Sequence, residues 1–327
     1  MIYRRHAIGL MGIAVFAPAV VGRALAQTAS VQNWPNRFVR LIVPVAPGGP
    51  TDFVARLIAE PLSRMWGQQV VIENKPGAGT NLASDAVAHS NPDGYTMLFA
   101  TASLAANRNL YSTLSYDPIA DFAPVTHLTS FPYFMFVPNS LPATSVKEFI
   151  AYAKTKKLTL ASPGAGSAPH LTGELFKSMA GIEMTHVPYR GASLVLNDLM
   201  PGRVDVYFAS GTVLANMRAG QIRGLAVTGA KRDPIAPELP TVAEAGVPGY
   251  EVSSWHGLFL PANTPPEIVE KVNADVRTAL ADPVVKAKLE QNGYEAVGSS
   301  PAELAALLRA EIEKWGAVIK AAGIVIR

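Results

Sequence analysis

The stretch that decides the fold is VRLIVPVAPGGPTDFVAR, which runs from Val39 to Arg56. It opens with a short apolar run, Leu41 to Val45, which is long enough for a buried strand and too short for a helix. Two prolines and two glycines end this run, and apolar residues then recur at helical spacing from Phe53 onward. The stretch therefore predicts a strand, a glycine turn and the start of a helix.

The predicted helix start is a candidate anion site. Gly48 and Gly49 allow a guest to approach the backbone, and the first turn of a helix offers free N–H groups and the positive end of the helix dipole. Asp52 falls in that first turn, where an acidic side chain compensates the dipole. An ordinary turn between a strand and a helix has the same sequence features, so this stretch alone leaves both interpretations open.

The pattern continues toward the C-terminus. Apolar runs at 69–73 and 96–100 predict two further strands, with a helix over 82–89 between them. Connections of this length between strands indicate a parallel sheet covered by helices. Thr101 and Ser103 follow the third strand, so we expect them at the carboxyl edge of the sheet, where open α/β sheets bind ligands.

A second α/β unit is expected in the middle of the chain. Its loops at 162–169 and 188–191 repeat the glycine turn before a helix. The runs at 131–138 and 252–260 are expected to cross between the two units, and three C-terminal helices should complete the first one. The expected division is 1–26 as a signal peptide, 27–128 with 252–327 as domain 1, and 129–251 as domain 2.

The N-terminus is predicted to be an export signal. Arg4 and Arg5 precede an apolar run at 7–21 that is too short to span a membrane, and an A-x-A site ends at Ala26, after which cleavage is expected. Twin-arginine and Sec export both remain open. The signal holds three of the 28 Lys and Arg residues and none of the 25 Asp and Glu residues, so the mature chain is near neutral. We therefore expect no nucleic-acid partner.

Enzyme classes find little support in the sequence. The chain has no cysteine, which excludes thiolate chemistry and Cys-ligated metals. Its six histidines stand at no metal-binding spacing, and G-x-S-x-G, H-E-x-x-H, Walker and G-x-G-x-x-G motifs are absent. We expect no cofactor, no metal and no catalysis. Ser167 and His170 lie one helical turn apart, which keeps a secreted hydrolase as the alternative.

Several polar residues have two interpretations each. Asp205 is compatible with a ligand contact or with holding a neighbouring turn, and Arg190 with a ligand carboxylate or with a solvated loop. His256 is compatible with the rim of a cleft or with hinge packing. The aromatic run at 131–136 is expected in the core.

Seven segments, in their order along the chain, resemble the periplasmic solute-binding proteins of tripartite tricarboxylate transporters, also called the Bordetella uptake gene (Bug) family. The segments span nearly the whole mature chain. They are PVAPGGPTD at 44–52, ENKPGAG at 73–79, PDGYT at 92–96, GAGSAPH at 164–170, HVPYRG at 186–191, GRVD at 202–205 and PGYE at 248–251.

The resemblance implies an α/β, two-lobed periplasmic-binding-protein fold (Venus flytrap, type II-like) with a ligand cleft between the lobes. It implies a periplasmic protein, not itself membrane-embedded, that captures a small carboxylate and delivers it to large and small membrane subunits. A di- or tricarboxylate, an acidic amino acid and an aromatic acid all remain open as ligands. A periplasmic sensor subunit is a further alternative.

The resemblance also implies which residues bind the ligand, because the loops matching 46–51 and 164–170 hold a carboxylate in that family. The expected ligand-binding residues are Ala46, Gly48, Gly49, Thr51, Thr101, Ser103, Gly166, Ser167, His170, Arg190, Asp205 and Ser210. The chain departs from the family pattern at 80–84, which lacks a further glycine pattern, and at Arg190, where lysine is frequent. Arginine binds a carboxylate through two parallel hydrogen bonds and lysine does not.

Overall fold

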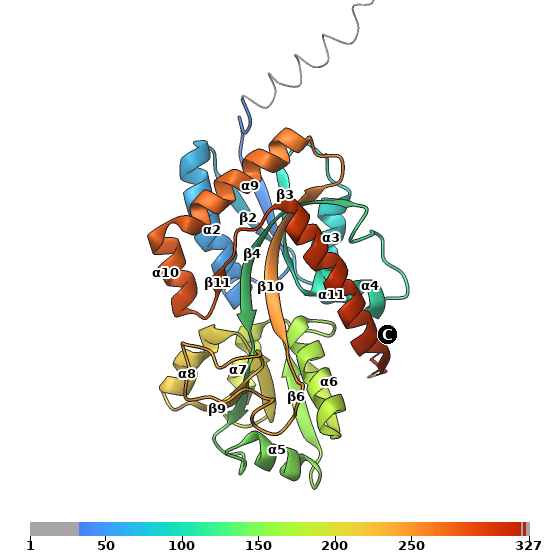
Figure 1. Cartoon of the computed structure of the whole chain (residues 1–327), viewed down its shortest axis with the longest axis vertical. Helices are drawn as coiled ribbons and strands as arrows, with labels where there is room; N and C mark the ends of the chain where they lie inside the picture. Colours follow the sequence, from blue (N-terminus) through green and yellow to red (C-terminus); the bar gives the residue numbers. More distant parts are fainter. Residues whose placement is uncertain (1–32, 322, 325–327) are drawn as a thin grey trace, which may run out of the picture.

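The chain folds into two α/β lobes, seen one above the other in Figure 1. The computed structural model describes residues 33–321, 323 and 324, so the predicted signal at 1–26 lies outside the described residues. Lobe A is built around a six-stranded sheet and lobe B around a five-stranded sheet. The expected two-lobed α/β class is confirmed.

Lobe A contains the predicted strand–turn–helix unit at its centre. The strand order is β11-β4-β10-β3-β1-β2, with β1, β2 and β3 parallel and β10 antiparallel to both β3 and β4. The strands are β1 (Val39–Val43), β2 (Val70–Asn74), β3 (Thr96–Thr101), β4 (Phe122–Pro132), β10 (Ser253–Pro261) and β11 (Glu295–Ala296).

The helices of lobe A form two packed groups. The first group is α2 (Pro50–Trp66), α9 (Pro266–Ala281) and α10 (Pro283–Gln291). The second group is α3 (Asn81–Ala88), α4 (Ser103–Leu110) and α11 (Pro301–Ala321), with the short helix η1 (Ala78–Thr80) before α3. Figure 1 shows these two groups on opposite sides of the sheet.

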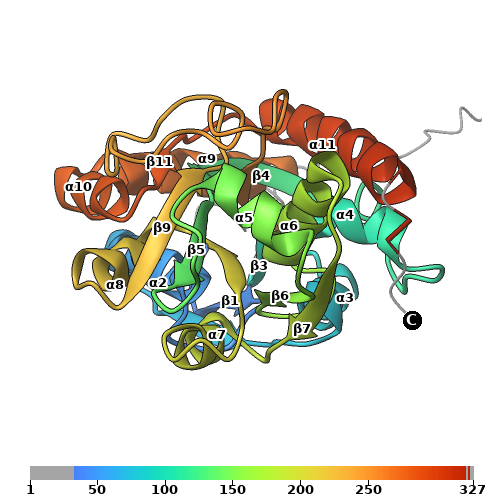
Figure 2. The same ribbon diagram turned by 90° about the horizontal axis from the view of Figure 1, so that it is seen from below.

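Lobe B has the strand order β7-β6-β8-β5-β9, with β6 parallel to β7 and β8. Its strands are β5 (Phe134–Pro138), β6 (Leu158–Ser162), β7 (Met184–Pro188), β8 (Val206–Ala209) and β9 (Ile222–Val227). Its helices are α5 (Val146–Ala153), α6 (Ala168–Ala180), α7 (Ala192–Leu199), η2 (Gly211–Val213) and α8 (Leu214–Arg218). Seen from below in Figure 2, α6 and α7 lie on opposite sides of this sheet.

Alternation along β8 separates the two cores of lobe B. Val206 and Phe208 pack in the cluster that contains Phe176 of α6, whereas Tyr207 packs with Val195 of α7. A strand buried on both faces requires this near-continuous apolar sequence.

The elements of lobe A that were not predicted include the first part of β4 and helix α4. Strand β4 begins at Phe122, nine residues before the expected crossing strand, because its pairing with β10 stabilises a segment in which Pro124 and Thr126 interrupt the apolar pattern. The C-terminal half of helix α4 contains two asparagines and an arginine and shows no clear apolar stripe in sequence, yet Leu104 and Leu110 are buried. Tertiary packing decides both elements.

One buried threonine joins the two chain segments that cross between the lobes. The backbone N–H of Tyr133, between β4 and β5, donates to Oγ1 of Thr228 (2.8 Å), and the N–H of Thr228 donates to the carbonyl of Tyr133 (2.8 Å). Oγ1 of Thr228 donates to the carbonyl of Val252 (2.6 Å), just before β10. Thr228 is fully buried, so these bonds connect the outgoing and the returning segment without competition from water.

All four tryptophans of the chain lie in lobe A. Trp34 packs against Trp66 of α2, with ring centroids 5.1 Å apart. Trp255 of β10 and Trp315 of α11 both donate to the buried carboxylate of Glu311, at 3.4 and 2.9 Å.

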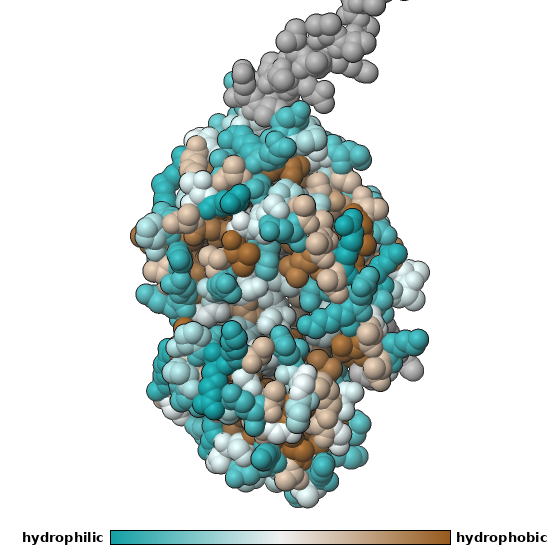
Figure 3. Space-filling model, in the orientation of Figure 1, coloured by the Kyte–Doolittle hydropathy of each residue, from teal (hydrophilic) through white to brown (hydrophobic). Residues whose placement is uncertain are grey.

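The described helices give no candidate for a membrane span, since none of them joins sufficient length to sufficient apolar character. The face drawn in Figure 3 carries hydrophilic residues over both lobes, with hydrophobic residues scattered among them.

Thr228→Val tests the junction between the crossing segments. We expect the free energy of unfolding to fall by about 2–4 kcal/mol, because the N–H of Tyr133 and the carbonyl of Val252 each lose a partner in a buried place. Chemical denaturation measures this loss.

Two variants serve as controls for Thr228→Val. Thr228→Ser keeps the hydroxyl and should lose about 1 kcal/mol for the buried methyl group. Thr278→Val, whose exposed hydroxyl bonds to Ala274 within α9, should change stability by less than about 0.5 kcal/mol. An equal loss in the Ser and Val variants at 228 would contradict the role of the hydroxyl.

Candidate functional site

A cavity of about 900 Å³ lies between the lobes. Its lining comes mainly from the loops that follow β1, β2 and β3 in lobe A and β6, β7 and β8 in lobe B. These loops meet because they all leave the carboxyl ends of parallel strands, and the two sheets face each other across the crossing segments. The volume is at the upper end of the range for small-molecule pockets.

Four helices begin at the cavity wall. The residues that start or precede α2, α4, α6 and α7 line it, namely Gly49, Ser103, Ser167 and Gly191. None of these four helices has a hydrogen bond from its own N-cap side chain. Their first-turn N–H groups therefore lack the partner that a cap would supply, and the positive ends of four helix dipoles point toward the cavity.

The lining carries almost no formal charge. Within the described chain, Arg190 is the single lysine, arginine, aspartate or glutamate among the lining residues, and its side chain is exposed. His256 also lines the cavity, but burial, with a smaller effect of the charge on His127, lowers its pKa to about 3. The imidazole is therefore neutral at physiological pH, and an anion here would meet neutral donors and one guanidinium.

His256 is held on both ring nitrogens. Nδ1 lies 2.9 Å from the hydroxyl of Thr129 on β4, and Nε2 lies 3.4 Å from the hydroxyl of Thr51 at the start of α2. The rings of Phe99 and Phe131 each lie 4.9 Å from the imidazole. His256 thus connects β10 to the first glycine loop and also forms part of the cavity wall, so both of its expected roles, at the rim and in packing, describe it.

Tyrosine hydroxyls form much of the polar surface. Tyr133, Tyr207 and Tyr294 line the cavity and are buried, and burial raises the pKa of each phenol, so all three stay protonated. Tyr294, after α10 in lobe A, donates to Oγ of Ser210 at the end of β8 in lobe B (3.1 Å). This bond is a direct link between the lobes beside the cavity.

Thr101 contributes an unpaired hydroxyl. It ends β3 and lines the cavity, and within the described chain its buried Oγ1 has no hydrogen-bond partner. A buried polar atom without a partner costs about 1–3 kcal/mol. An acceptor placed in the cavity would remove that cost.

The loops of the two lobes touch at two points of the lining. A Cβ built on Gly79 of lobe A would lie 3.2 Å from the carbonyl oxygen of Ala165 in lobe B. A Cβ built on Gly191 of lobe B would lie 3.7 Å from Cβ of Ala46 in lobe A. The lobes are therefore close together in this structure.

Eight of the twelve predicted site residues line the cavity, and contact with a ligand stays a prediction for each of them. They are Ala46, Gly49, Thr51, Thr101, Ser103, Ser167, Arg190 and Ser210. The structure does not bring Gly48, Gly166, His170 and Asp205 into the lining.

Gly48 supports the first loop from within. Its N–H donates to the carboxylate of Asp52 (2.9 Å), which also accepts from Arg56 (2.8 Å) and Asn74 (2.8 Å). Burial raises the pKa of Asp52, but the bonds from Arg56, Gly48 and Asn74 outweigh it and hold the pKa below its ordinary value. Asp52 is thus an ionised organiser of the loop, which goes beyond the expected compensation of the dipole.

Asp205 holds a neighbouring strand. Its carboxylate accepts from the backbone N–H (2.7 Å) and the hydroxyl (2.8 Å) of Thr159 on β6. These bonds support the interpretation in which Asp205 holds a neighbouring segment of the chain.

Ser167 and His170 do not form a hydrolytic pair. Oγ of Ser167 donates to the carbonyl of Gly164 (2.7 Å), while Nδ1 of His170 accepts from the N–H of Gly166 (3.2 Å). Within the described chain no hydrogen bond joins the two side chains, whereas an activated nucleophile is hydrogen-bonded to its base. The same part of the chain holds no cluster of three His, Asp or Glu suited to a metal ion.

The sequence did not indicate the aromatic lining. For Tyr207 the sequence held a weak signal: alternation along β8 places its side chain on the other face of the sheet from Val206 and Phe208. Tyr111 and Tyr294 had none, since pairing of β11 with β4 brings Tyr294 to the cavity from a distant part of the sequence.

Residues 54–324 match the model of the tripartite tricarboxylate transporter family receptor. BugT of Bordetella pertussis is 31% identical over 316 residues, which cover 95% of this chain and 97% of that protein.

Two solved structures share the fold closely. Rpa4515 of R. palustris, solved with adipate, has a TM-score of 0.86 and 44% identity, covering 89% of this chain and 99% of that one. MatC of Rhodopseudomonas palustris, solved with bound malate, has a TM-score of 0.84 and 36% identity, covering 88% and 100%. The family model matches most of the chain, and these relatives cover nearly all of it. The chain therefore belongs to the tripartite tricarboxylate transporter receptors, the Bug family of periplasmic solute-binding proteins.

Proposed function

We propose that this protein is a non-enzymatic periplasmic receptor that binds a small dicarboxylate between its lobes and delivers it to the membrane subunits of a tripartite transporter. The observation that carries the proposal is the convergence of four uncapped helix starts on a cavity with a single formal charge in its lining. In this proposal the signal is cleaved after Ala26. Residues 27–128 with 252–327 then form one domain and 129–251 the other.

Neutral donors suffice for useful affinity. A hydrogen bond to a charged acceptor contributes about 1.5–3 kcal/mol, and a helix terminus adds about 0.3–1 kcal/mol. Micromolar binding needs about 8 kcal/mol. Three or four donors from the starts of α2, α4 and α6 therefore support micromolar binding of one carboxylate.

Arg190 favours a dicarboxylate over the other expected acids. It adds one cation at the rim, outside the set of helix starts that would hold the first carboxylate. The cavity lining also contains Phe131 and several tyrosine rings, which suit the apolar body of a short diacid. Adipate and malate, bound in the two relatives, are dicarboxylates. A tricarboxylate would bring more negative charge than this lining balances.

Closure of the lobes follows from ligand contacts on both sides. A ligand that bonds to Thr101 in lobe A and Ser167 in lobe B stabilises the arrangement in which both lie at the cavity. The crossing segments around Thr228 are the place where rotation between the lobes would occur. The membrane subunits then bind the closed form.

Thr101→Val tests the carboxylate site. The variant removes a buried hydroxyl that has no partner in the described chain, so the melting temperature of the unliganded protein should not fall and is expected to rise. Adipate affinity should fall about 10- to 100-fold, because a hydrogen bond to the carboxylate is lost. Isothermal titration calorimetry with adipate and malate measures this change.

Thr126→Val is the matched control for Thr101→Val. Its hydroxyl donates to the carbonyl of Ser299 (2.8 Å), so this variant should lose stability and keep its affinity. Undiminished adipate binding by Thr101→Val would place the carboxylate elsewhere. Failure of the wild-type protein to bind any carboxylate in a panel would refute the proposed function.

Arg190→Met tests the class of the ligand. Adipate should bind about 10-fold more weakly, while hexanoate, which lacks the second carboxylate, should bind as it does to the wild type. Arg190→Lys should give an intermediate affinity, because the charge remains and the paired hydrogen bonds do not. The control is Arg64→Met, which removes an exposed arginine paired with Glu60 on α2. An equal effect of Arg190→Met on both acids would argue against a dicarboxylate.

A further inference from the structure

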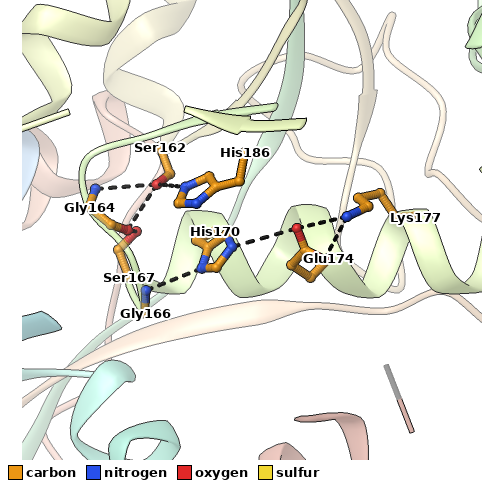
Figure 4. Close-up of polar contacts among 8 residues, drawn as sticks. All are labelled: Ser162, Gly164, Gly166, Ser167, His170, Glu174, Lys177 and His186. Atoms are coloured by element: carbon orange, nitrogen blue, oxygen red, sulfur yellow. Dashed lines mark hydrogen bonds and ion pairs between the residues drawn. The ribbon is translucent and has the colours of Figure 1, made fainter. Parts of the chain in front are cut away.

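Two histidine rings stack behind the loop that leads into α6, outside the cavity lining (Figure 4). His170 belongs to α6 and His186 to β7, and their ring centroids lie 3.6 Å apart at an interplanar angle of 18°. The side chain of His170 is buried. His170 was expected to bind the ligand, but neither histidine lines the cavity, so the pair needs another role.

His170 fixes the second half of the loop. Its Nδ1 accepts from the N–H of Gly166 (3.2 Å), and its Nε2 lies 3.5 Å from the carboxylate of Glu174. An acceptor at Nδ1 requires the neutral ring with its proton on Nε2. Gly166 has φ +76°, a conformation that residues with a side chain rarely adopt, so the bond holds the loop at a position that favours glycine.

His186 fixes the first half of the loop. Its Nε2 lies 2.7 Å from Oγ of Ser162, which donates to the carbonyl of Gly164 (2.9 Å) and accepts from its N–H (3.2 Å). The single hydroxyl proton of Ser162 is used on Gly164, so His186 donates its Nε2 proton. Figure 4 shows the contacts that connect the two histidines and Ser162 to Gly164 and Gly166 of the loop.

We propose that His170 and His186, in their neutral forms, are positioning residues that hold loop 163–167 in the shape that presents its cavity-lining atoms and the start of α6 to a ligand carboxylate. The ligand in this proposal rests on the proposed function. The effect on the loop rests on the contacts alone.

Protonation of His170 would remove this support. A proton on Nδ1 turns the acceptor into a donor that faces the N–H of Gly166, and that bond is lost. The charged and titratable groups around the ring are Glu174 and Lys177 on α6 and His186 on β7. The neighbouring β6 carries no titratable side chain, and Tyr207 of β8 packs in the other core cluster of lobe B.

The environment of His186 disfavours a positive charge on its ring. Burial, followed by the charge of His170, lowers the pKa of His186 to about 4. His186 therefore stays neutral at the pH values where histidines usually titrate, and it donates to Ser162 without interruption.

The test compares two replacements of His170. His170→Asn places an amide oxygen near the position of Nδ1 and does not titrate, whereas His170→Leu keeps bulk and has no acceptor. The two measurements are the amide-exchange protection factor of Gly166 in the ligand-free protein, by NMR, and the adipate affinity. Both are measured at about pH 8, above the range in which histidines usually titrate.

We expect the Leu variant to lose about 5- to 10-fold in both quantities at pH 8, the effect of one hydrogen bond. The Asn variant should keep the wild-type values of both quantities. His89→Asn, which replaces an exposed histidine after α3, should also keep them.

Wild-type protection and affinity in the Leu variant would overturn the proposal, and so would values like those of the Leu variant in a folded Asn variant. If the Leu variant fails to fold, His186→Gln is used instead, because the amide nitrogen of glutamine takes the place of Nε2. Retained amide protection at Gly164 in this variant supports the proposal. Loss of that protection in a folded His186→Gln protein overturns the proposal. Absence of adipate binding in the wild type would refute the proposed function, and the protection factors of Gly166 would then decide the role of the histidines alone.

Discussion

The hydrogen bonds of Thr228 are the constraint on which the rest of the structure depends. They join the segment that leaves lobe A at Tyr133 to the segment that returns at Val252, and they are buried. Because the two segments are fixed to each other, the carboxyl edges of the two parallel sheet regions face one cavity. The junction therefore sets how the loops of one lobe face those of the other, which the sequence of each loop alone does not determine.

The site combines neutral donors with strong internal support. Asp52 fixes the first glycine loop, and the histidine pair with Ser162 fixes the second loop from outside the cavity lining. The carboxylate and the two histidines that hold these loops therefore stay out of the lining, in which Arg190 is the single formal charge among the described residues. In a low-dielectric cleft such fixed dipoles interact strongly with an anion and need no reorganisation when it arrives.

The sequence predicted what is local and missed what is brought from a distance. The strand–glycine–helix units at 39–56 and 158–179 follow from apolar runs and turn residues, and eight of the twelve residues expected at the site line the cavity. Gly48 and Gly166 lie in the expected loops, but their N–H groups turn inward, a direction set by Asp52 and His170. Tyr294 was unpredictable because its place depends on the pairing of β11 with β4.

The confinement of all four tryptophans to lobe A determines what their emission can report. Trp34, Trp66 and Trp315 lie among the helices that cover the sheet of lobe A, remote in the chain from the loops of lobe B. Trp255 is adjacent on β10 to His256, which lines the cavity. Tryptophan emission therefore observes the protein from one lobe only, with Trp255 on the strand that reaches the cavity, and lobe B contributes none until a tryptophan is introduced there.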